Sequence, residues 1–198
     1  MRYVIDMNRE KIIDMFEESI EVKKQIINSE LIDEIDMAAK VIINSYKNGG
    51  KVLICGNGGS AADSQHVAGE LINKFRIDRK PLGAIALSTD TSVLTSIGND
   101  FSFDDVFKKQ VQGNGKEGDV LIGISTSGNS KNVIAAIDMA KRIGMKTITL
   151  TGSSGGKLNG MADICLKVPS NDTPRIQESH ITILHIICDL VEQELFAK

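Results

Sequence analysis

The sequence has few cysteines and little excess charge, and each shortage excludes a class of protein. Its three cysteines, Cys55, Cys165 and Cys188, stand singly, without the paired spacing of a disulfide framework or a zinc ribbon. They lie in apolar runs, so we expect small core residues. The 23 basic and 26 acidic residues give a net charge of −3 and are scattered along the chain, which argues against nucleic acid or an anionic membrane as partner.

Long hydrophobic runs are also missing. No segment approaches the roughly 20 apolar residues of a membrane-spanning helix, and the first residues lack the apolar stretch of a secretion signal. We therefore expect a cytoplasmic protein. The 198 residues, 41% hydrophobic and 25% charged, suffice for one structural domain, with room for an appendage.

Hydrophobic periodicity predicts the elements. Apolar residues at helical spacing between Ile12 and Ile43 predict two leading helices, separated at Asn28-Ser29 and closed by residues 48–50 (NGG). Short apolar runs then alternate with helical stretches, which predicts an α/β fold with a doubly wound, mostly parallel five-stranded sheet. The expected strands are 52–55, 84–87, 120–124, 147–150 and 164–168, and the expected later helices are 61–75, 132–142 and 176–196.

The first of two polar loops spans residues 56–60 (GNGGS), between a strand and a helix. Its glycines permit a sharp turn, and the unpaired amides of a helix start attract an anion. Gly56, Gly58 and Ala61 also match the dinucleotide pattern G-x-G-x-x-A, which is weak when alone. The acidic residue after the next strand, Asp90, comes later than the ~20-residue spacing of a ribose-binding carboxylate.

The second loop, residues 125–130 (STSGNS), carries four hydroxyls and also joins a strand to a helix. An ordinary helix cap explains one hydroxyl. Four of them at the carboxyl end of a strand, where parallel sheets bind ligands, indicate a phosphate site instead.

Two helices carry side chains suited to acid–base chemistry. His66 and Glu70 are four residues apart, so they share one helix face and could share a proton or a metal, or be a surface Glu beside a half-buried His. Gln177, His180 and His185 lie on the apolar last helix, where a lone histidine is more often a core or interface residue.

Four strings together resemble one known family. Residues 55–60 (CGNGGS), 97–100 (IGND), 123–130 (GISTSGNS) and 175–178 (RIQE) are similar to those of the sedoheptulose-7-phosphate isomerases, or phosphoheptose isomerases, within the SIS sugar-phosphate group. The similarity covers essentially the whole chain. It implies a flavodoxin-like SIS domain over residues 49–198 and a helical hairpin over residues 1–48 used for oligomer packing.

The resemblance also implies an activity. Family members convert D-sedoheptulose 7-phosphate to D-glycero-D-manno-heptose 7-phosphate through an enediol, the first step of ADP- or GDP-heptose biosynthesis. It implies Glu70 and His185 as catalytic residues, one zinc ion per subunit on His66, Glu70, Gln177 and His185, a homotetramer and no nucleotide cofactor. The implied substrate-binding residues are Asn57, Gly58, Gly59, Ser60, His66, Glu70, Asn99, Asp100, Ser125, Thr126, Ser127, Ser130 and Gln177.

Helix geometry adds a constraint on this site. Gln177 and His185 are eight residues apart, so one straight helix separates them by ~12 Å and points them roughly 80° apart. We therefore expect one of them to come from a neighbouring subunit. Pro174 departs from the family, which often has an acidic residue there.

Three other functions stay open at this point. A non-catalytic SIS protein that regulates replication initiation would act by protein contact, although the chain retains Glu70, Gln177 and His185. A nucleotide-dependent oxidoreductase would use the first loop, but the hydroxyl-rich second loop disfavours it. The substrate could also be another sugar phosphate.

Overall fold

The computed structural model describes residues 2–197, and the side chains of residues 8–197. All five expected strands are present: β1 (Val52–Gly56), β2 (Ala84–Ala86), β3 (Val120–Ile124), β4 (Lys146–Thr151) and β5 (Ile164–Lys167). The α-helices are α1 (Arg2–Ile27), α2 (Leu31–Lys47), α3 (Gly59–Ile72), α4 (Thr91–Asp100), α5 (Val106–Asn114), α6 (Lys131–Ile143) and α7 (Thr173–Phe196). Among the described residues, no helix is both long enough and apolar enough to cross a membrane.

The strands form one fully parallel sheet in the order β2-β1-β3-β4-β5. The winding direction reverses between β1 and β3, so the connections after these strands leave on opposite faces and open a crevice at their carboxyl ends. Gly56 at the end of β1 is in register with Ile124 at the end of β3. The two polar loops therefore begin side by side at this crevice.

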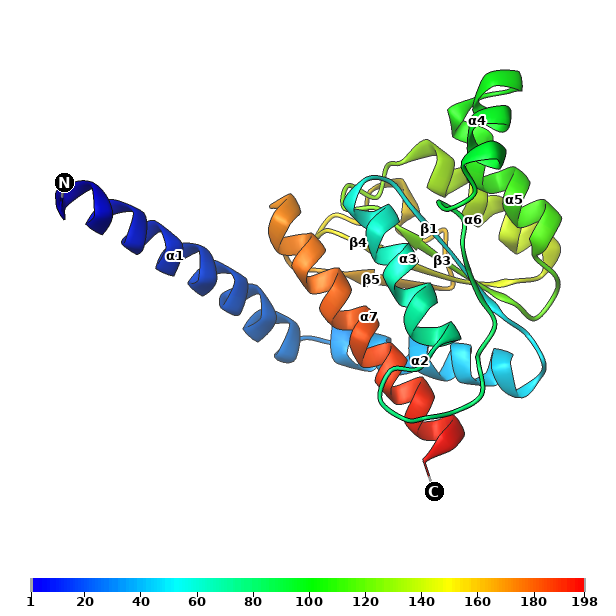
Figure 1. Ribbon diagram of the computed structural model, residues 1–198, viewed down its shortest axis with the longest axis horizontal. Helices are drawn as coiled ribbons and strands as arrows, with labels where there is room; N and C mark the ends of the chain where they lie inside the picture. The colour runs from blue at the N-terminus through cyan, green and yellow to red at the C-terminus, as the bar shows by residue number, and fades with distance from the viewer. Residues whose placement is uncertain (1, 198) are drawn as a thin grey trace.

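Helices cover both faces of the sheet (Figure 1). Successive strand residues point to opposite faces. Val52 and Ile54 of β1 accordingly pack in one cluster with apolar residues of α2, α3 and α7, whereas Leu53 and Cys55 pack in another with α5 and α6. Both faces of the strand are buried, which explains the continuous apolar runs in the sequence.

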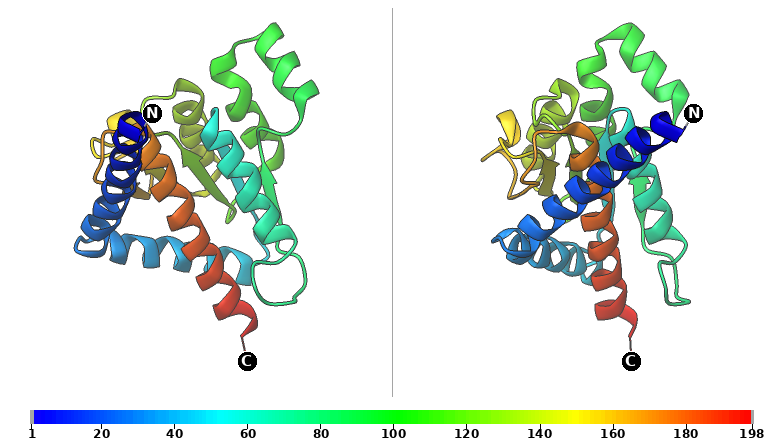
Figure 2. Two further views of the ribbon diagram at one scale, coloured as in Figure 1. Left: turned by 60° about the vertical axis from the view of Figure 1, so that its left-hand side comes forward. Right: turned by 90° about the vertical axis from the view of Figure 1, so that its left-hand side faces the viewer.

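The two leading helices have different positions. As predicted, they separate at Ser29, whose hydroxyl accepts a hydrogen bond from the Leu31 amide at 3.3 Å. α2 belongs to the layer that covers the sheet and buries Ile35 and Ile42 in its core. α1 meets α2 at an angle and extends away from the sheet, so the pair is not a closely packed hairpin (Figure 2).

The structure corrects the sequence-based prediction around the sheet. α3 ends at Ile72, and Phe75 lies in the following loop rather than in the helix. α4 and α5 were not predicted, because α4 buries none of its side chains and α5 has only nine residues, so neither shows a clear apolar stripe. The cysteines agree with expectation: Cys55 and Cys188 are buried, Cys165 is half-buried, and all three are free thiols.

Candidate active site at the crevice between the first and third strands

The first loop turns at Gly58, whose φ of 56° suits glycine because it has no Cβ. α3 starts at Gly59, immediately after the turn. Ser60 is buried at the start of the helix, and Gly58 and Gly59 are exposed. The backbone at this helix start therefore lies open to a ligand, as the anion-site prediction requires.

The hydroxyls of the second loop do not cap α6 in the ordinary way. Ser130 is the N-cap residue, but its side chain accepts no capping hydrogen bond. Its hydroxyl instead lies 2.9 Å from that of Ser125. Thr126 is half-buried and Ser127 is exposed. The cap explanation therefore fails for Ser130, whose hydroxyl is paired with that of Ser125.

A pair of amides joins the two loops. Asn57 donates to the Asn132 side-chain oxygen at 2.9 Å, and Asn132 donates to the Asn57 side-chain oxygen at 2.8 Å. Asn132 is buried in the first turn of α6. Asn132 was not predicted as part of the site, because an asparagine at the start of a helix has an ordinary capping explanation. Here it fixes the spacing of the two loops.

Three side chains from α3 and α7 meet at one point. The Nε2 atom of His66 lies 3.2 Å from a carboxylate oxygen of Glu70 and 2.9 Å from the Nε2 atom of His185. The ring of Phe75 lies beside that of His185, with 5.6 Å between centroids. The His66 side chain is 49% exposed and that of Glu70 is 24% exposed, so solvent and substrate reach the cluster.

The cluster has the ligand chemistry of a divalent metal site. One ligand atom from each of His66, Glu70 and His185 lies within 4.8 Å of the other two. Two imidazole nitrogens and a carboxylate oxygen form a common zinc set, which leaves a fourth position for another ligand or substrate. The residues therefore fit the implied metal.

Gln177 and His185 meet different residues of the same chain. α7 runs beside α3 of the same chain (Figure 1), so it presents different residues to the two ends of α3. His185 meets His66, and the Gln177 amide lies against Gly59, where an added Cβ would come within 2.5 Å of its nitrogen. The two side chains therefore do not converge on one point within this chain, and a ligand from a neighbouring subunit stays a prediction.

The remaining predicted residues lie elsewhere. Asn99 and Asp100 are exposed at the end of α4, where the Asn99 amide donates to Asp100 at 2.8 Å. α4 projects from the domain, apart from the α3 and α7 pair (Figure 1). His180 is fully buried, and its Nε2 atom lies 3.1 Å from the Thr151 carbonyl oxygen, so it is a core residue. Pro174 occupies the first turn of α7, where its missing amide hydrogen costs nothing.

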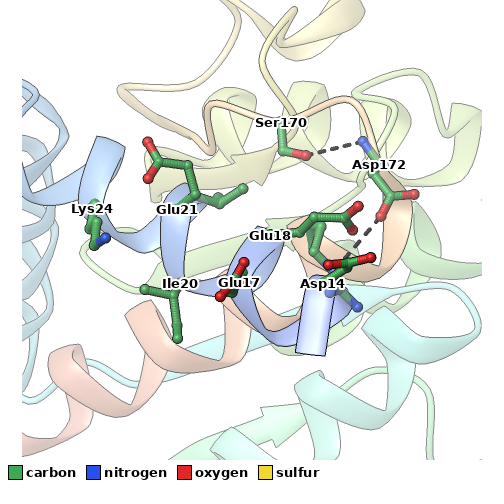
Figure 3. Close-up of a pocket in the computed structure, with 10 residues that line it drawn as sticks. Asp14, Glu17, Glu18, Ile20, Glu21, Lys24, Ser170 and Asp172 are labelled. Atoms are coloured by element: carbon green, nitrogen blue, oxygen red, sulfur yellow. Dashed lines mark hydrogen bonds and ion pairs between the residues drawn. The ribbon is translucent and has the colours of Figure 1, made fainter. Parts of the chain in front are cut away.

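A larger cavity lies away from this site. It has a volume of about 890 Å³ and lies between α1 and the start of α7 (Figure 3). Its basic lining residues are Lys24 and Arg175, and its acidic ones are Asp14, Glu17, Glu18, Glu21 and Asp172. This excess of negative charge repels a phosphate ester. The cavity is therefore a poor substrate site despite its size.

Comparison with known proteins shows which family the chain belongs to. Residues 15–152 match the SIS domain family. A phosphoheptose isomerase of Clostridium acetobutylicum is 57% identical over 181 residues, which cover 91% of this chain and 92% of the relative. The phosphoheptose isomerase 2 of Campylobacter jejuni is 55% identical over 184 residues, which cover 92% of each chain.

Solved structures agree. The phosphoheptose isomerase GmhA of Neisseria gonorrhoeae superposes with a TM-score of 0.88 at 46% identity, and the match covers 93% of this chain and 98% of that one. A strand order of β2-β1-β3-β4-β5 also differs from the 3-2-1-4-5-6 order of dinucleotide-binding domains, which removes the main support for an oxidoreductase. The chain therefore belongs to the SIS domain family, within its phosphoheptose isomerase branch.

Proposed function

We propose that this enzyme interconverts D-sedoheptulose 7-phosphate and D-glycero-D-manno-heptose 7-phosphate. The observation that carries the proposal is the grouping of His66, Glu70 and His185 at one end of a crevice whose other end holds the two polar loops. Ser60 and His66 are six residues apart on α3, about 9 Å along the helix axis. That separation is comparable to the length of an extended heptose, with phosphate at one end and the C1–C2 unit at the other.

The polar loops bind the phosphate in this proposal. Helix-start amides of α3 and α6 attract the anion, and hydroxyls donate to its oxygens. The serines and threonine that serve this role are Ser60, Ser125, Thr126, Ser127 and Ser130, with Asn57, Gly58, Gly59 and Gln177 beside the sugar. Because the loops hold the phosphate at a fixed distance from His66, Glu70 and His185, C1 and C2 of the sugar lie against these three side chains.

Isomerisation needs one proton moved between carbons and another between oxygens. A base removes the proton from C1 to give the enediol, and the proton returns at C2, while a second group moves a proton between O1 and O2. Glu70 and His185 perform these two tasks, because a carboxylate and an imidazole accept and return protons near neutral pH. A zinc ion held by His66, Glu70 and His185 would polarise the carbonyl and stabilise the enediolate. Within this chain Gln177 lies at Gly59, so it would join that zinc ion only from a neighbouring copy.

An oligomer, a homotetramer in the proposal, completes the site. α1 exposes Ile12, Met15, Phe16 and Ile20, with Phe16 68% exposed, on a helix that extends from the domain. Such an apolar surface favours burial against another copy of the chain. Asn99 and Asp100, which lie apart from the cluster in their own chain, reach the sugar from a neighbouring copy in this arrangement. We place the enzyme in the cytoplasm.

The proposal is tested with sedoheptulose 7-phosphate in deuterated water. Wild-type protein should form the aldose phosphate and incorporate deuterium, whereas Glu70→Gln and His185→Gln should lose roughly 10²- to 10⁴-fold in rate. If wild type forms no aldose and exchanges no C1 hydrogen, the proposal is wrong. If it is instead active on a shorter sugar phosphate, the substrate assignment is wrong and the site assignment stands.

A further inference from the structure

A buried ion pair joins the two helices that carry the cluster. The Arg79 Nε atom donates to Glu192 at 2.8 Å, and their side chains are 2% and 1% exposed. Arg79 lies in the loop after α3, and Glu192 lies on α7, seven residues beyond His185. Seven residues are nearly two full helical turns, so Glu192 and His185 face the same side of α7.

Arg79 also closes the end of α3. Its guanidinium donates to the Glu70 carbonyl oxygen at 3.0 Å and to the Leu71 carbonyl oxygen at 2.8 Å. These carbonyl oxygens belong to the last turn of α3, where no further helix amide follows to donate a hydrogen bond to them. The arginine therefore binds the backbone of Glu70, the residue whose carboxylate belongs to the cluster.

Glu192 holds the loop that follows α3. Its carboxylate accepts hydrogen bonds from the backbone amides of Phe75 at 2.9 Å, Arg76 at 2.5 Å and Ile77 at 2.8 Å. Burial alone would raise the pKa of Glu192, but these amides and Arg79 lower it on balance. The held loop places the Phe75 ring beside His185.

We propose that Arg79 and Glu192 are positioning residues for the isomerisation. Together they fix the distance between the backbones of Glu70 and His185 and hold Phe75 against the His185 ring. Their hydrogen bonds within the described part of the chain go to each other and to backbone groups, and not to the polar loops or the cluster side chains. Loss of the pair should therefore misplace the proton-transferring groups and leave phosphate binding intact. This inference rests on the proposed function.

The same chain offers a matched control. Lys51 and Asp119 form a second ion pair, 2.5 Å apart, in which the Asp119 side chain is 0% exposed and also accepts from the Lys51 and Lys116 amides. These residues precede β1 and β3, so the pair lies at the amino ends of the strands, opposite the crevice. Asp119→Asn should weaken folding in the same way as Glu192→Gln without reaching the active site.

The test measures kcat and KM for sedoheptulose 7-phosphate in three variants, at a temperature where circular dichroism shows each to be folded. Glu192→Gln should lower kcat by roughly 10- to 100-fold, because small misplacements of reacting groups have effects of that size. Its KM should stay within about threefold of wild type. Phe75→Leu keeps the ion pair, and should lower kcat at least about fivefold. Asp119→Asn should keep wild-type kcat.

Several outcomes overturn the inference. It is wrong if Glu192→Gln keeps wild-type kcat, if its kcat falls no further than that of Asp119→Asn, or if KM rises while kcat is unchanged. Should Glu192→Gln not fold, Phe75→Leu decides, and wild-type kcat in that variant overturns the inference. An inactive wild-type enzyme, or a fully active Glu70→Gln variant, would instead contradict the proposed function.

Discussion

His66 and His185 are 119 residues apart in the chain, and their Nε2 atoms lie 2.9 Å apart at the side of Glu70. Two neutral imidazoles approach this closely when one donates a hydrogen bond to the other, and a metal can replace that shared proton. The contact exists because α7 returns across the sheet beside α3 (Figure 1).

Removal of one imidazole should weaken zinc binding. His66→Gln should raise the zinc dissociation constant by at least about 100-fold, more than the 10- to 100-fold effect typical of a residue that only orients a ligand. Competition with a chromogenic chelator measures this dissociation constant. His180→Gln is the control, because His180 is fully buried away from the cluster, and it should bind zinc as wild type does. Equal zinc affinity in both variants would refute the ligand assignment.

Gly59→Ala should impair activity without harming the fold. The new Cβ would lie 2.5 Å from the Gln177 nitrogen, so the flexible amide must move away from the start of α3. We expect kcat/KM to fall by about tenfold, or roughly 1.4 kcal/mol of transition-state stabilisation. Gly69→Ala in the same helix meets nothing within 4 Å and should keep full activity. An active Gly59→Ala enzyme would show that the Gln177 position is unimportant.

Gly128→Ala should loosen the second loop. Gly128 has a φ of 65°, and an added Cβ would collide with the backbone of Gly155. Gly118→Ala is the control: Gly118 also has a positive φ, 84°, but an added Cβ there would meet no atom within 4 Å. The control should cost roughly 1 kcal/mol of folding free energy and leave KM unchanged. Gly128→Ala should cost more and raise KM for the sugar phosphate, as measured by urea unfolding and initial rates. A KM equal to that of Gly118→Ala would contradict this role of the loop.

Acid should destabilise the fold through His180. Burial lowers the pKa of His180 from 6.5 to about 4, although a backbone hydrogen bond with Thr151 opposes the shift. Between these values the unfolded chain binds a proton that the folded chain does not, so stability falls as pH drops from about 6.5 to 4. The full effect is about 3 kcal/mol.

Thermal unfolding at intervals from pH 7 to pH 4.5 measures this effect. His180→Gln keeps a side-chain donor near the Thr151 carbonyl oxygen but does not titrate. Its melting temperature should therefore fall less over this pH range than that of wild type. Acidic groups contribute equally to the pH dependence of both proteins, so the difference reports His180. Parallel curves would show that His180 is not the source.

The sequence by itself determined the sheet. Five short apolar runs predict buried parallel strands, because strands covered on both faces are apolar along their length. The loops at residues 56–60 and 125–130 were also recognisable, since glycines and hydroxyls at strand ends have few other uses. Periodicity found α7 but not α4, whose side chains are all at least partly exposed.

Only the tertiary structure decided how the site is assembled. Helix geometry placed Gln177 and His185 too far apart to share one zinc ion within a single chain, but it does not say which residues each of them meets. The packing of α7 along α3 places Gln177 at Gly59 and His185 at His66 within one chain. Such pairings depend on where the sheet brings distant helices together, and local sequence carries no record of that distance. The ion pair of Arg79 and Glu192, 113 residues apart, is invisible to sequence patterns for the same reason.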